Sequence, residues 1–133
     1  MNPHLFVYGT LLSGARHPMG ERLRRAARLV GDASIAGQLY RIGHYPGLAE
    51  TAAKGAIVHG EVYVLGNPAS MLKWLDAYEG IRPGGPGDYE RVERMVHLAS
   101  GAALSAWVYL YRRRLGPRRP IPGGRWLAAS DRP

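Results

Sequence analysis

The sequence predicts an α+β domain, a small mixed or antiparallel β-barrel with flanking helices. Five or six short segments have the apolar pattern of strands, whereas few have the period of a helix. The 133 residues include 18 glycines and 10 prolines, which favours many strands and turns over a helical bundle. A sheet of many short strands tends to curl toward a barrel, whose mouth can hold a small ligand.

The first half of the chain alternates strand and turn signals around one short helix. In residues 20–29, Leu23 and Ala27 fall on one helical face. Residues 34–42 alternate in the manner of a strand. The expected order is a strand over 4–9, a helix over 20–29, a strand over 34–42, a turn around Pro46-Gly47 and a strand over 56–65.

Gly9 interrupts the first predicted strand directly after Tyr8. A glycine weakens the interior of a strand, and it often marks a bulge or a place where another group approaches the backbone closely. We therefore expect either a local irregularity at Gly9 or a close contact there.

The strongest helix signal begins at Asn67, a suitable N-cap, with Pro68 at the first helical position. The apolar pattern continues to Tyr78, and Gly80 supplies a C-terminal stop. We then expect a loop over 82–88, strands over 89–98 and 104–112 joined by a hairpin at Ser100-Gly101, and a partly irregular tail from Gly116. The expected organisation is one domain over 1–115 with a Pro/Gly/Arg-rich tail over 116–133.

The composition limits the chemistry that the chain can perform. The absence of cysteine excludes disulfides and cysteine-ligated metals and fits a reducing cytoplasm. The sequence has neither an apolar run long enough for a transmembrane helix nor a signal-peptide pattern, so we expect a cytoplasmic protein without a membrane partner. The histidines lack metal-binding spacing and the serines lack a nucleophile-elbow motif. We expect no metal and no cofactor.

The formal net charge is +8, and only two of the 18 basic residues are lysines. This excess indicates either a compositional preference for arginine or an anionic partner. Trp126 could tie the tail to the barrel or to a partner chain. A solvated basic surface is favoured over a nucleic-acid site, because no aromatic platform or reading motif accompanies the tail arginines. These are Arg112, Arg113, Arg114, Arg118, Arg119 and Arg125.

Glu79 lies on the apolar stripe of the predicted helix, four residues after Leu75 and seven after Leu72. A carboxylate on a buried face must be paired, hydrogen-bonded or protonated. In an apolar cleft its proton affinity rises, which suits general acid–base chemistry near neutral pH. Alternatively, the last turn of the helix frays into water, or Glu79 pairs with Arg82 or Arg91.

The segments "FVYGTLL", "HGEVYVL", "LDAYEG", "YERVERMVHL" and "AWVYLYR" follow in this order over about residues 4–112. With them the chain resembles the γ-glutamylcyclotransferase-like family, which includes γ-glutamylamine cyclotransferases and AIG2-like proteins. The resemblance implies the barrel-like α+β fold of that family with a single polar cavity. It also implies conversion of a γ-glutamyl amine or amino acid to 5-oxoproline plus free amine, without metal or cofactor.

The resemblance further implies roles for particular residues. The acid/base glutamate of the family ends the D-x-x-E-G helix and matches Glu79. A tyrosine soon after it matches Tyr89, and a second aromatic from a late strand matches Tyr109, or less well Tyr111. The stretch that lines the cavity and binds the γ-glutamyl or 5-oxoproline group through its backbone matches Tyr8, Gly9, Thr10 and Leu11.

Two features depart from the family pattern. The loop between Glu79 and Tyr89 is long, which affects the placement of Tyr89. In glutathione-specific members the first motif continues toward a tryptophan, whereas Leu12-Ser13 follow here, which argues against glutathione as substrate. The alternative function is a non-catalytic small-ligand-binding protein of the same fold, with its basic tail on an anionic partner. A monomer or a homodimer is expected.

Overall fold

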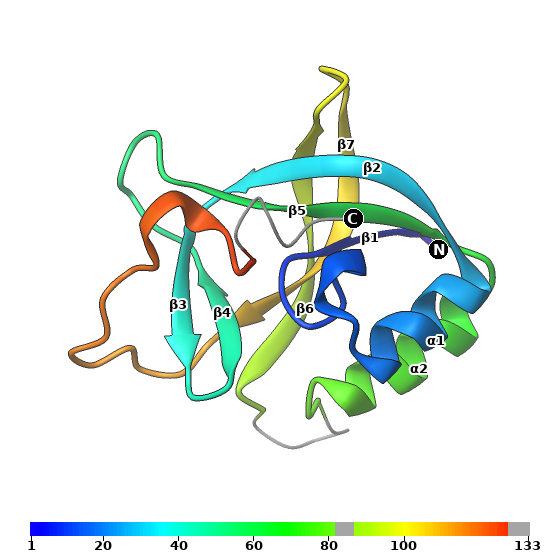
Figure 1. Ribbon diagram of the computed structural model, residues 1–133, viewed down its shortest axis with the longest axis horizontal. Coiled ribbons are helices and arrows are strands. Elements are labelled where there is room, and N and C mark those ends of the chain that lie inside the picture. The colour runs from blue at the N-terminus through cyan, green and yellow to red at the C-terminus, as the bar shows by residue number, and fades with distance from the viewer. Residues whose placement is uncertain (82–86, 128–133) are drawn as a thin grey trace.

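The computed structural model describes residues 1–81 and 87–127 (Figure 1). β1, β5, β2, β6 and β7 form, in this order, a closed barrel, and β3 and β4 form a separate two-stranded sheet. The predicted α+β barrel with flanking helices is confirmed. The elements are β1 (His4–Val7), η1 (Ser13–Ala15), α1 (Pro18–Ala26), β2 (Ala27–Ala36), β3 (Gln38–Ile42), β4 (Tyr45–Ala49), β5 (Ile57–Leu65), α2 (Pro68–Tyr78), β6 (Tyr89–Leu98), β7 (Ala103–Tyr111) and η2 (Pro122–Gly124).

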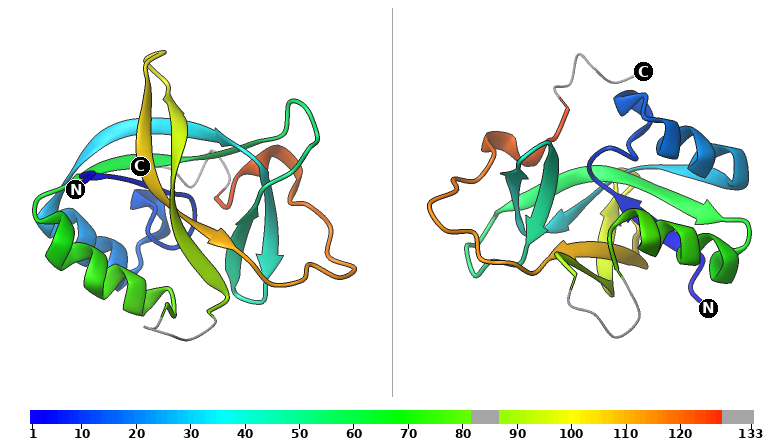
Figure 2. Two further views of the ribbon diagram at one scale, coloured as in Figure 1. Left: turned by 180° about the vertical axis from the view of Figure 1, so that it is seen from behind. Right: turned by 90° about the horizontal axis from the view of Figure 1, so that it is seen from below.

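Antiparallel pairs make most of the barrel, and one parallel contact closes it. β1 pairs with β5, β5 with β2, β2 with β6, and β6 with β7, all antiparallel. Leu5 of β1 pairs in parallel with Trp107 of β7. Both helices lie on one side of the barrel and the β3–β4 sheet lies on the other (Figure 2).

β1 divides its side chains between two apolar clusters, because successive residues of a strand point to opposite faces. Phe6 and Tyr8 belong to the cluster inside the barrel. Leu5 and Val7 belong to a second cluster that includes residues of α1 and α2. Leu75 of α2 is fully buried in this second cluster. The packing therefore fixes the C-terminal half of α2 against the barrel.

The local signals for α2 and for the last hairpin predict the structure correctly. The Asn67 side chain accepts a hydrogen bond from the N–H of Ser70 at 3.2 Å, and Pro68 is the first helical residue. β6 has the expected bounds, and Gly101, at φ +101°, lies in the turn before β7. Within the described residues, no helix is both long and apolar enough to cross a membrane.

α1 begins and ends earlier than the range 20–29 predicted for it. The His17 side chain accepts a hydrogen bond from the N–H of Met19 at 3.1 Å, and Pro18 occupies the first helical position. Ala27 pairs with Leu65 of β5. Strand pairing therefore takes the residues after Ala26 that helical periodicity alone assigned to the helix.

The prediction of one strand over 34–42 is wrong, because β2 ends before Gly37 and β3 begins after it. Gly37 has φ +153°, and a Cβ atom there would lie 2.7 Å from Cδ1 of Leu48. The turn predicted at Pro46-Gly47 lies instead at Gly43-His44, with Pro46 inside β4. A proline is tolerated there because β4 belongs to a sheet of only two strands.

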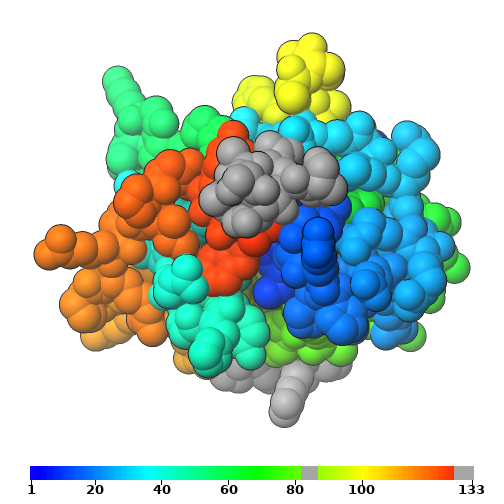
Figure 3. All heavy atoms as spheres, viewed as in Figure 1, coloured from blue at the N-terminus to red at the C-terminus, as the bar shows by residue number. Residues whose placement is uncertain are grey.

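The tail packs on the barrel as far as Leu127. The N–H of Ile121 donates to the carbonyl oxygen of Leu39 at 2.6 Å. Trp126 packs against both apolar clusters, with the guanidinium of Arg41 4.5 Å from its ring centre. Figure 3 shows this segment between the β3–β4 sheet and the residues that follow β1. Trp126 therefore ties the tail to the barrel of its own chain.

Candidate active site

A cavity of about 440 Å³ lies between the segment after β1, the β3–β4 turn and the end of α2, with walls that include β6 and β7. These segments are far apart in the sequence, and the closure of the barrel brings them together. The cavity wall contains every residue that the sequence analysis assigned to a site. They are Tyr8, Gly9, Thr10, Leu11, Glu79, Tyr89 and Tyr109.

The chain turns sharply after β1, where the N–H of Leu12 donates to the carbonyl oxygen of Gly9 at 3.0 Å. The backbone N–H groups of Gly9, Thr10 and Leu11 have no acceptor in the described part of the chain. Gly9 and Leu11 are buried. Buried backbone donors are nearly always paired in proteins, so the N–H groups of Gly9 and Leu11 are candidates for binding an anion or a carbonyl group.

Gly9 does make a close approach, and the group that approaches it belongs to the protein. A Cβ atom at position 9 would overlap the ring of Pro46 in β4. Gly9 therefore sets the spacing between the turn after β1 and the β3–β4 sheet, which contributes another part of the cavity wall. Its contact with a substrate remains a prediction.

A glycine-containing motif ends α2 next to the cavity. Gly80 has φ +79°, and its N–H donates to the carbonyl oxygen of Ala77 at 3.1 Å. The N–H of Ile81 donates to the carbonyl oxygen of Asp76 at 2.9 Å. This pair of bonds is a Schellman motif, which makes Glu79 the C-cap residue. The helix end is therefore ordered, and the expectation of a frayed last turn is not met.

Glu79 is partly buried in the cavity wall. Desolvation, and secondarily the negative charge of Asp76, raise the pKa of its carboxyl group to about 7. The negative end of the helix dipole acts in the same direction. In the described part of the chain, no hydrogen-bond donor or cation pairs with this carboxylate. Of the two expected partners, Arg91 pairs with Asp76 instead, and Arg82 lies outside the described residues.

Asp76 is the centre of a polar cluster beside Glu79. Arg91 binds it in a bidentate manner, with Nε 2.7 Å from Oδ1 and Nη2 3.1 Å from Oδ2. The phenol of Tyr109 donates to Oδ1 at 2.7 Å. The guanidinium of Arg91 lies 4.4 Å from the ring centre of Trp107. This cluster holds Tyr109 in the cavity wall and places a fixed negative charge near Glu79.

Two further tyrosines of the wall are held by backbone groups. Tyr8 donates to the carbonyl oxygen of Tyr109 at 2.6 Å and accepts from the N–H of Leu48 at 3.2 Å. Tyr89 donates to the carbonyl oxygen of Pro46 at 2.7 Å. Tyr111, the less favoured candidate, packs edge-on against Tyr89 and does not line the cavity.

Raised pKa values keep the phenols of Tyr8, Tyr89 and Tyr109 neutral at physiological pH. Burial is the main cause that raises the pKa of Tyr89 and Tyr109 well above the usual range for a phenol. The negative charge of Glu79 is a further cause of the raised pKa in both cases. Burial likewise raises the pKa of Tyr8.

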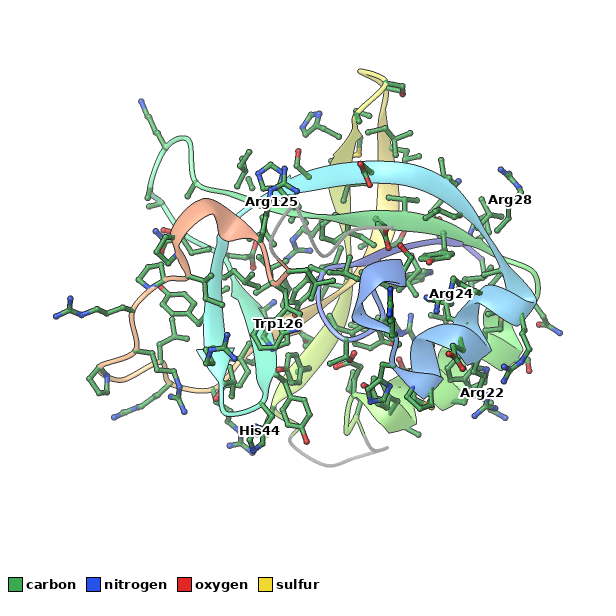
Figure 4. All side chains as sticks on the ribbon, viewed as in Figure 1. Arg22, Arg24, Arg28, His44, Arg125 and Trp126 are labelled. Carbon is green, nitrogen blue, oxygen red and sulfur yellow. The ribbon has the colours of Figure 1, made fainter. Side chains whose placement is uncertain are left out.

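The cavity is acidic although the protein is basic. Glu79 and Asp88 contribute carboxylates to its wall, and among residues 1–81 and 87–127 no arginine, lysine or histidine lines it. Arg22, Arg24 and Arg28 lie instead along α1 and the start of β2 (Figure 4). No group of three or more acidic or histidine side chains in the described ranges is arranged to hold a metal ion.

Sequence reasoning did not assign Asp76, Arg91 or Pro46 to the site. Asp76 precedes Glu79 by three residues, a spacing that places two helical residues on neighbouring positions of one face. This spacing was the signal available for Asp76. The roles of Arg91 and Pro46 depend on contacts between distant strands.

A model of the family described as "Gamma-glutamyl cyclotransferase, AIG2-like" matches residues 5–128. The chain belongs to this family. The γ-glutamylcyclotransferase family protein YtfP of Escherichia coli K12 is 39% identical over 125 residues, which cover 92% of this chain and 95% of that protein. The γ-L-glutamyl-butirosin B γ-glutamyl cyclotransferase of Niallia circulans is 37% identical over 84% of this chain and 68% of that protein.

Solved structures agree with this family assignment. The solution structure of ytfP from Escherichia coli matches with a TM-score of 0.64 at 38% identity, over 96% of this chain and 98% of that one. The crystal structure of a mouse AIG2-like protein matches with a TM-score of 0.65 at 27% identity, over 81% of this chain and 76% of that one. The family and fold predicted from the sequence are therefore confirmed.

Proposed function

We propose that the protein is a γ-glutamyl cyclotransferase in which Glu79 is the general acid and base. The observation that carries the proposal is a carboxyl group in the cavity wall with a pKa of about 7 and no partner in the described chain. Such a group is present in both protonation forms near neutral pH, as general acid–base catalysis requires. The family membership supports the class of reaction.

The three backbone N–H groups after β1 would bind the acidic part of the substrate. Those of Gly9, Thr10 and Leu11 have no acceptor in the described chain and belong to residues of the cavity wall. They are suited to the α-carboxylate of a γ-glutamyl group or to its γ-carbonyl oxygen, where negative charge develops during the reaction.

The reaction would take place within one substrate molecule. The α-ammonium group first gives a proton to Glu79, and the neutral amine attacks the γ-carbonyl carbon, which closes a five-membered ring. Glu79 passes this proton to the leaving nitrogen as the original amide bond breaks. The ring nitrogen still carries two protons at this stage. It gives one of them to the ionised Glu79, which passes it to the released amine. The products are 5-oxoproline and a protonated amine.

Two effects would accelerate this cyclisation. Proton transfer by a positioned carboxyl group contributes on the order of 10²- to 10⁴-fold. A cavity that holds the chain of the substrate folded adds the advantage of proximity between the amine and the carbonyl. The relative from Niallia circulans is named for a γ-glutamyl cyclotransferase reaction on γ-L-glutamyl-butirosin B, which supports a γ-glutamyl compound as the substrate class.

The alternative is a non-catalytic protein that uses the same cavity for binding and its basic tail for an anionic partner. In the structure, Arg112 pairs with Glu90 and Arg113 pairs with Asp88. These pairs offset the charge of two of the six arginines on which this alternative depends.

The test is release of 5-oxoproline from a panel of γ-glutamyl amines, γ-glutamyl amino acids and glutathione. We expect turnover of at least one γ-glutamyl amine and its loss in Glu79→Gln. Thermal unfolding confirms that the variant folds. Absence of turnover on every substrate, with ligand binding retained, would favour the non-catalytic alternative.

A further inference from the structure

A second pocket, of about 270 Å³, lies outside the barrel and is separate from the cavity that contains Glu79. We call it the outer pocket. Residues of β2, β5 and β6 and the tail segment after η2 line it, and none of them lines the cavity. Its polar side chains belong to Asp32, Ser34, His59, His97 and Arg125.

The strand register places three of these side chains in a row across the outer pocket. Ser34 of β2 pairs with His59 of β5 on one side and with His97 of β6 on the other. Residues directly opposite in antiparallel strands project from the same face, with Cβ atoms about 5 Å apart. The residue before each of the three belongs to the apolar cluster inside the barrel, so the row faces outward.

Arg125 reaches this row from the tail, and its neighbours in the chain fix its position. Gly124 is buried, and a Cβ atom there would overlap the carbonyl oxygen of Ile57 in β5. Trp126 packs against both apolar clusters. Figure 4 shows Arg125 beside the ribbons of β2 and β5. The backbone that carries Arg125 is therefore ordered before any ligand binds, which lowers the entropic cost of binding.

Three side chains of the outer pocket have unused hydrogen-bond donors. Within residues 1–81 and 87–127, the side chains of Ser34, His97 and Arg125 have neither a hydrogen bond nor an ion pair. Two other arginines of the C-terminal region, Arg112 and Arg113, pair with carboxylates. A guanidinium has five N–H donors, an imidazole at least one, and a hydroxyl one. The outer pocket therefore presents one half-buried cation and several donors to a ligand.

We propose that the outer pocket binds a phosphate group, free or carried by a small molecule, through Arg125, His97 and Ser34. A guanidinium binds phosphate through two parallel hydrogen bonds. The donors come from the tail, from β6 and from β2, and donors from three directions suit a tetrahedral anion better than a planar carboxylate. The volume is close to the lower limit of about 300 Å³ for sites that hold small organic ligands.

Asp32 opposes the binding of an anion in this pocket. It lines the same pocket, and it faces outward because Ala33, the next residue, belongs to the cluster inside the barrel. Its carboxylate repels a phosphate group nearby, as like charges do. Removal of this charge by Asp32→Asn should therefore tighten binding, whereas removal of the charge of Arg125 should weaken it.

The test is a titration of the ¹⁵N-labelled protein followed by NMR, in which amide shifts report both the place of binding and the Kd. The probes are glycerol 3-phosphate, inorganic phosphate, acetate and glycerol. The variants are Arg125→Gln, Ser34→Ala and Asp32→Asn. Arg119→Gln is the matched control, because Arg119 is an exposed arginine of the same tail that does not line the outer pocket.

We expect glycerol 3-phosphate to shift the amides around Ser34 and His97 with a Kd of about 1 mM or tighter, and glycerol to cause no shift. Arg125→Gln should weaken binding at least about tenfold and Ser34→Ala about two- to tenfold. Asp32→Asn should tighten binding, and Arg119→Gln should change the Kd by less than about twofold. Tighter binding of glycerol 3-phosphate than of inorganic phosphate would identify a phosphorylated small molecule, and equal binding would identify the free anion.

Equal losses in Arg125→Gln and Arg119→Gln would overturn the proposal, because they would show attraction by the general positive charge. Shifts that do not saturate, or that lie away from the outer pocket, would overturn it as well. Binding of acetate as tight as that of phosphate would overturn the choice of anion. Should Arg125→Gln fail to fold in a thermal scan, Ser34→Ala and Asp32→Asn decide by their opposite effects.

Discussion

Glu61 of β5 and Glu79 at the end of α2 are two carboxylates withdrawn from bulk water, and their surroundings differ. Glu61, only 6% exposed, accepts hydrogen bonds from the N–H of Ser13 at 2.8 Å and from its hydroxyl at 2.6 Å. Glu79 has no donor in the described chain. Burial alone therefore does not distinguish a functional carboxylate in this molecule, whereas unused acceptor capacity inside a cavity does.

Glu61 does not line the cavity, but it binds the segment that follows the cavity wall in the chain. Ser13 begins η1, directly after the turn that carries the backbone donors of Gly9 and Thr10. By binding Ser13, Glu61 ties this turn to β5 of the barrel. We infer that Glu61 stabilises the turn that carries these backbone donors, whereas the role proposed for Glu79 is proton transfer.

The largest effect should come from Glu79→Gln. An amide has nearly the shape of the carboxyl group but cannot exchange protons near neutral pH, so kcat/KM should fall by roughly 10²- to 10⁴-fold. Release of 5-oxoproline from a γ-glutamyl amine measures the loss. Activity within about threefold of the wild type would show that Glu79 is not the acid and base.

The second effect concerns stability and pH. Because the pKa of Glu79 is about 7 in the folded state against an ordinary 4.5, the folded state binds its proton more tightly than the unfolded state does. The contribution of Glu79 to the free energy of unfolding therefore falls as the pH rises from 4.5 to 7, by up to about 3 kcal/mol. Urea unfolding across this range should show a fall in the wild type that Glu79→Gln lacks. Parallel curves for the two proteins would contradict the raised pKa of Glu79.

Glu61→Gln is expected to lower the free energy of unfolding, unlike Glu79→Gln. The amide can accept through only one oxygen, so it cannot satisfy both the N–H and the hydroxyl of Ser13 as the carboxylate does. The free energy of unfolding at pH 7.5 should fall by about 1–3 kcal/mol. Glu79→Gln under the same conditions should lose no stability. Equal destabilisation by the two substitutions would remove the distinction between the carboxylates.

The smallest effect should come from Asp76→Asn. The charge of Asp76 is the second cause of the raised pKa of Glu79, so its removal should lower that pKa toward its ordinary value. Glu79 must be ionised to accept a proton, so kcat/KM should rise with pH at a lower pH than in the wild type. The midpoint of this rise is read independently of the absolute rate. A midpoint that stays in place or moves upward would exclude this electrostatic role.

Local signals in the sequence were sufficient to predict α2 and the position of Glu79 at its end. Asn67, Pro68 and Gly80 act through bonds within a few residues, so their types alone indicate where the helix begins and ends. The division of residues 34–42 and the strand around Pro46 could not be predicted in this way. Both depend on which distant segment becomes the neighbour in the sheet.

The residues predicted for a site line one cavity, but their hydrogen bonds could not be predicted from the sequence. The motif at Tyr8 to Leu11 and the carboxyl at Glu79 could be proposed from the sequence by resemblance and helical spacing. The direction of the Tyr109 hydrogen bond depends on Asp76, 33 residues earlier in the chain. The contact of Gly9 with Pro46 likewise depends on where β4 packs in the folded protein.

The most direct test is the titration of Glu79 itself. With ¹³C-labelled glutamate, the carboxyl resonance that is missing from the spectrum of Glu79→Gln can be followed by NMR from acid to alkaline pH. We expect a midpoint near 7. A midpoint near the ordinary 4.5 would show a solvated or paired carboxylate and would contradict the central role assigned to Glu79.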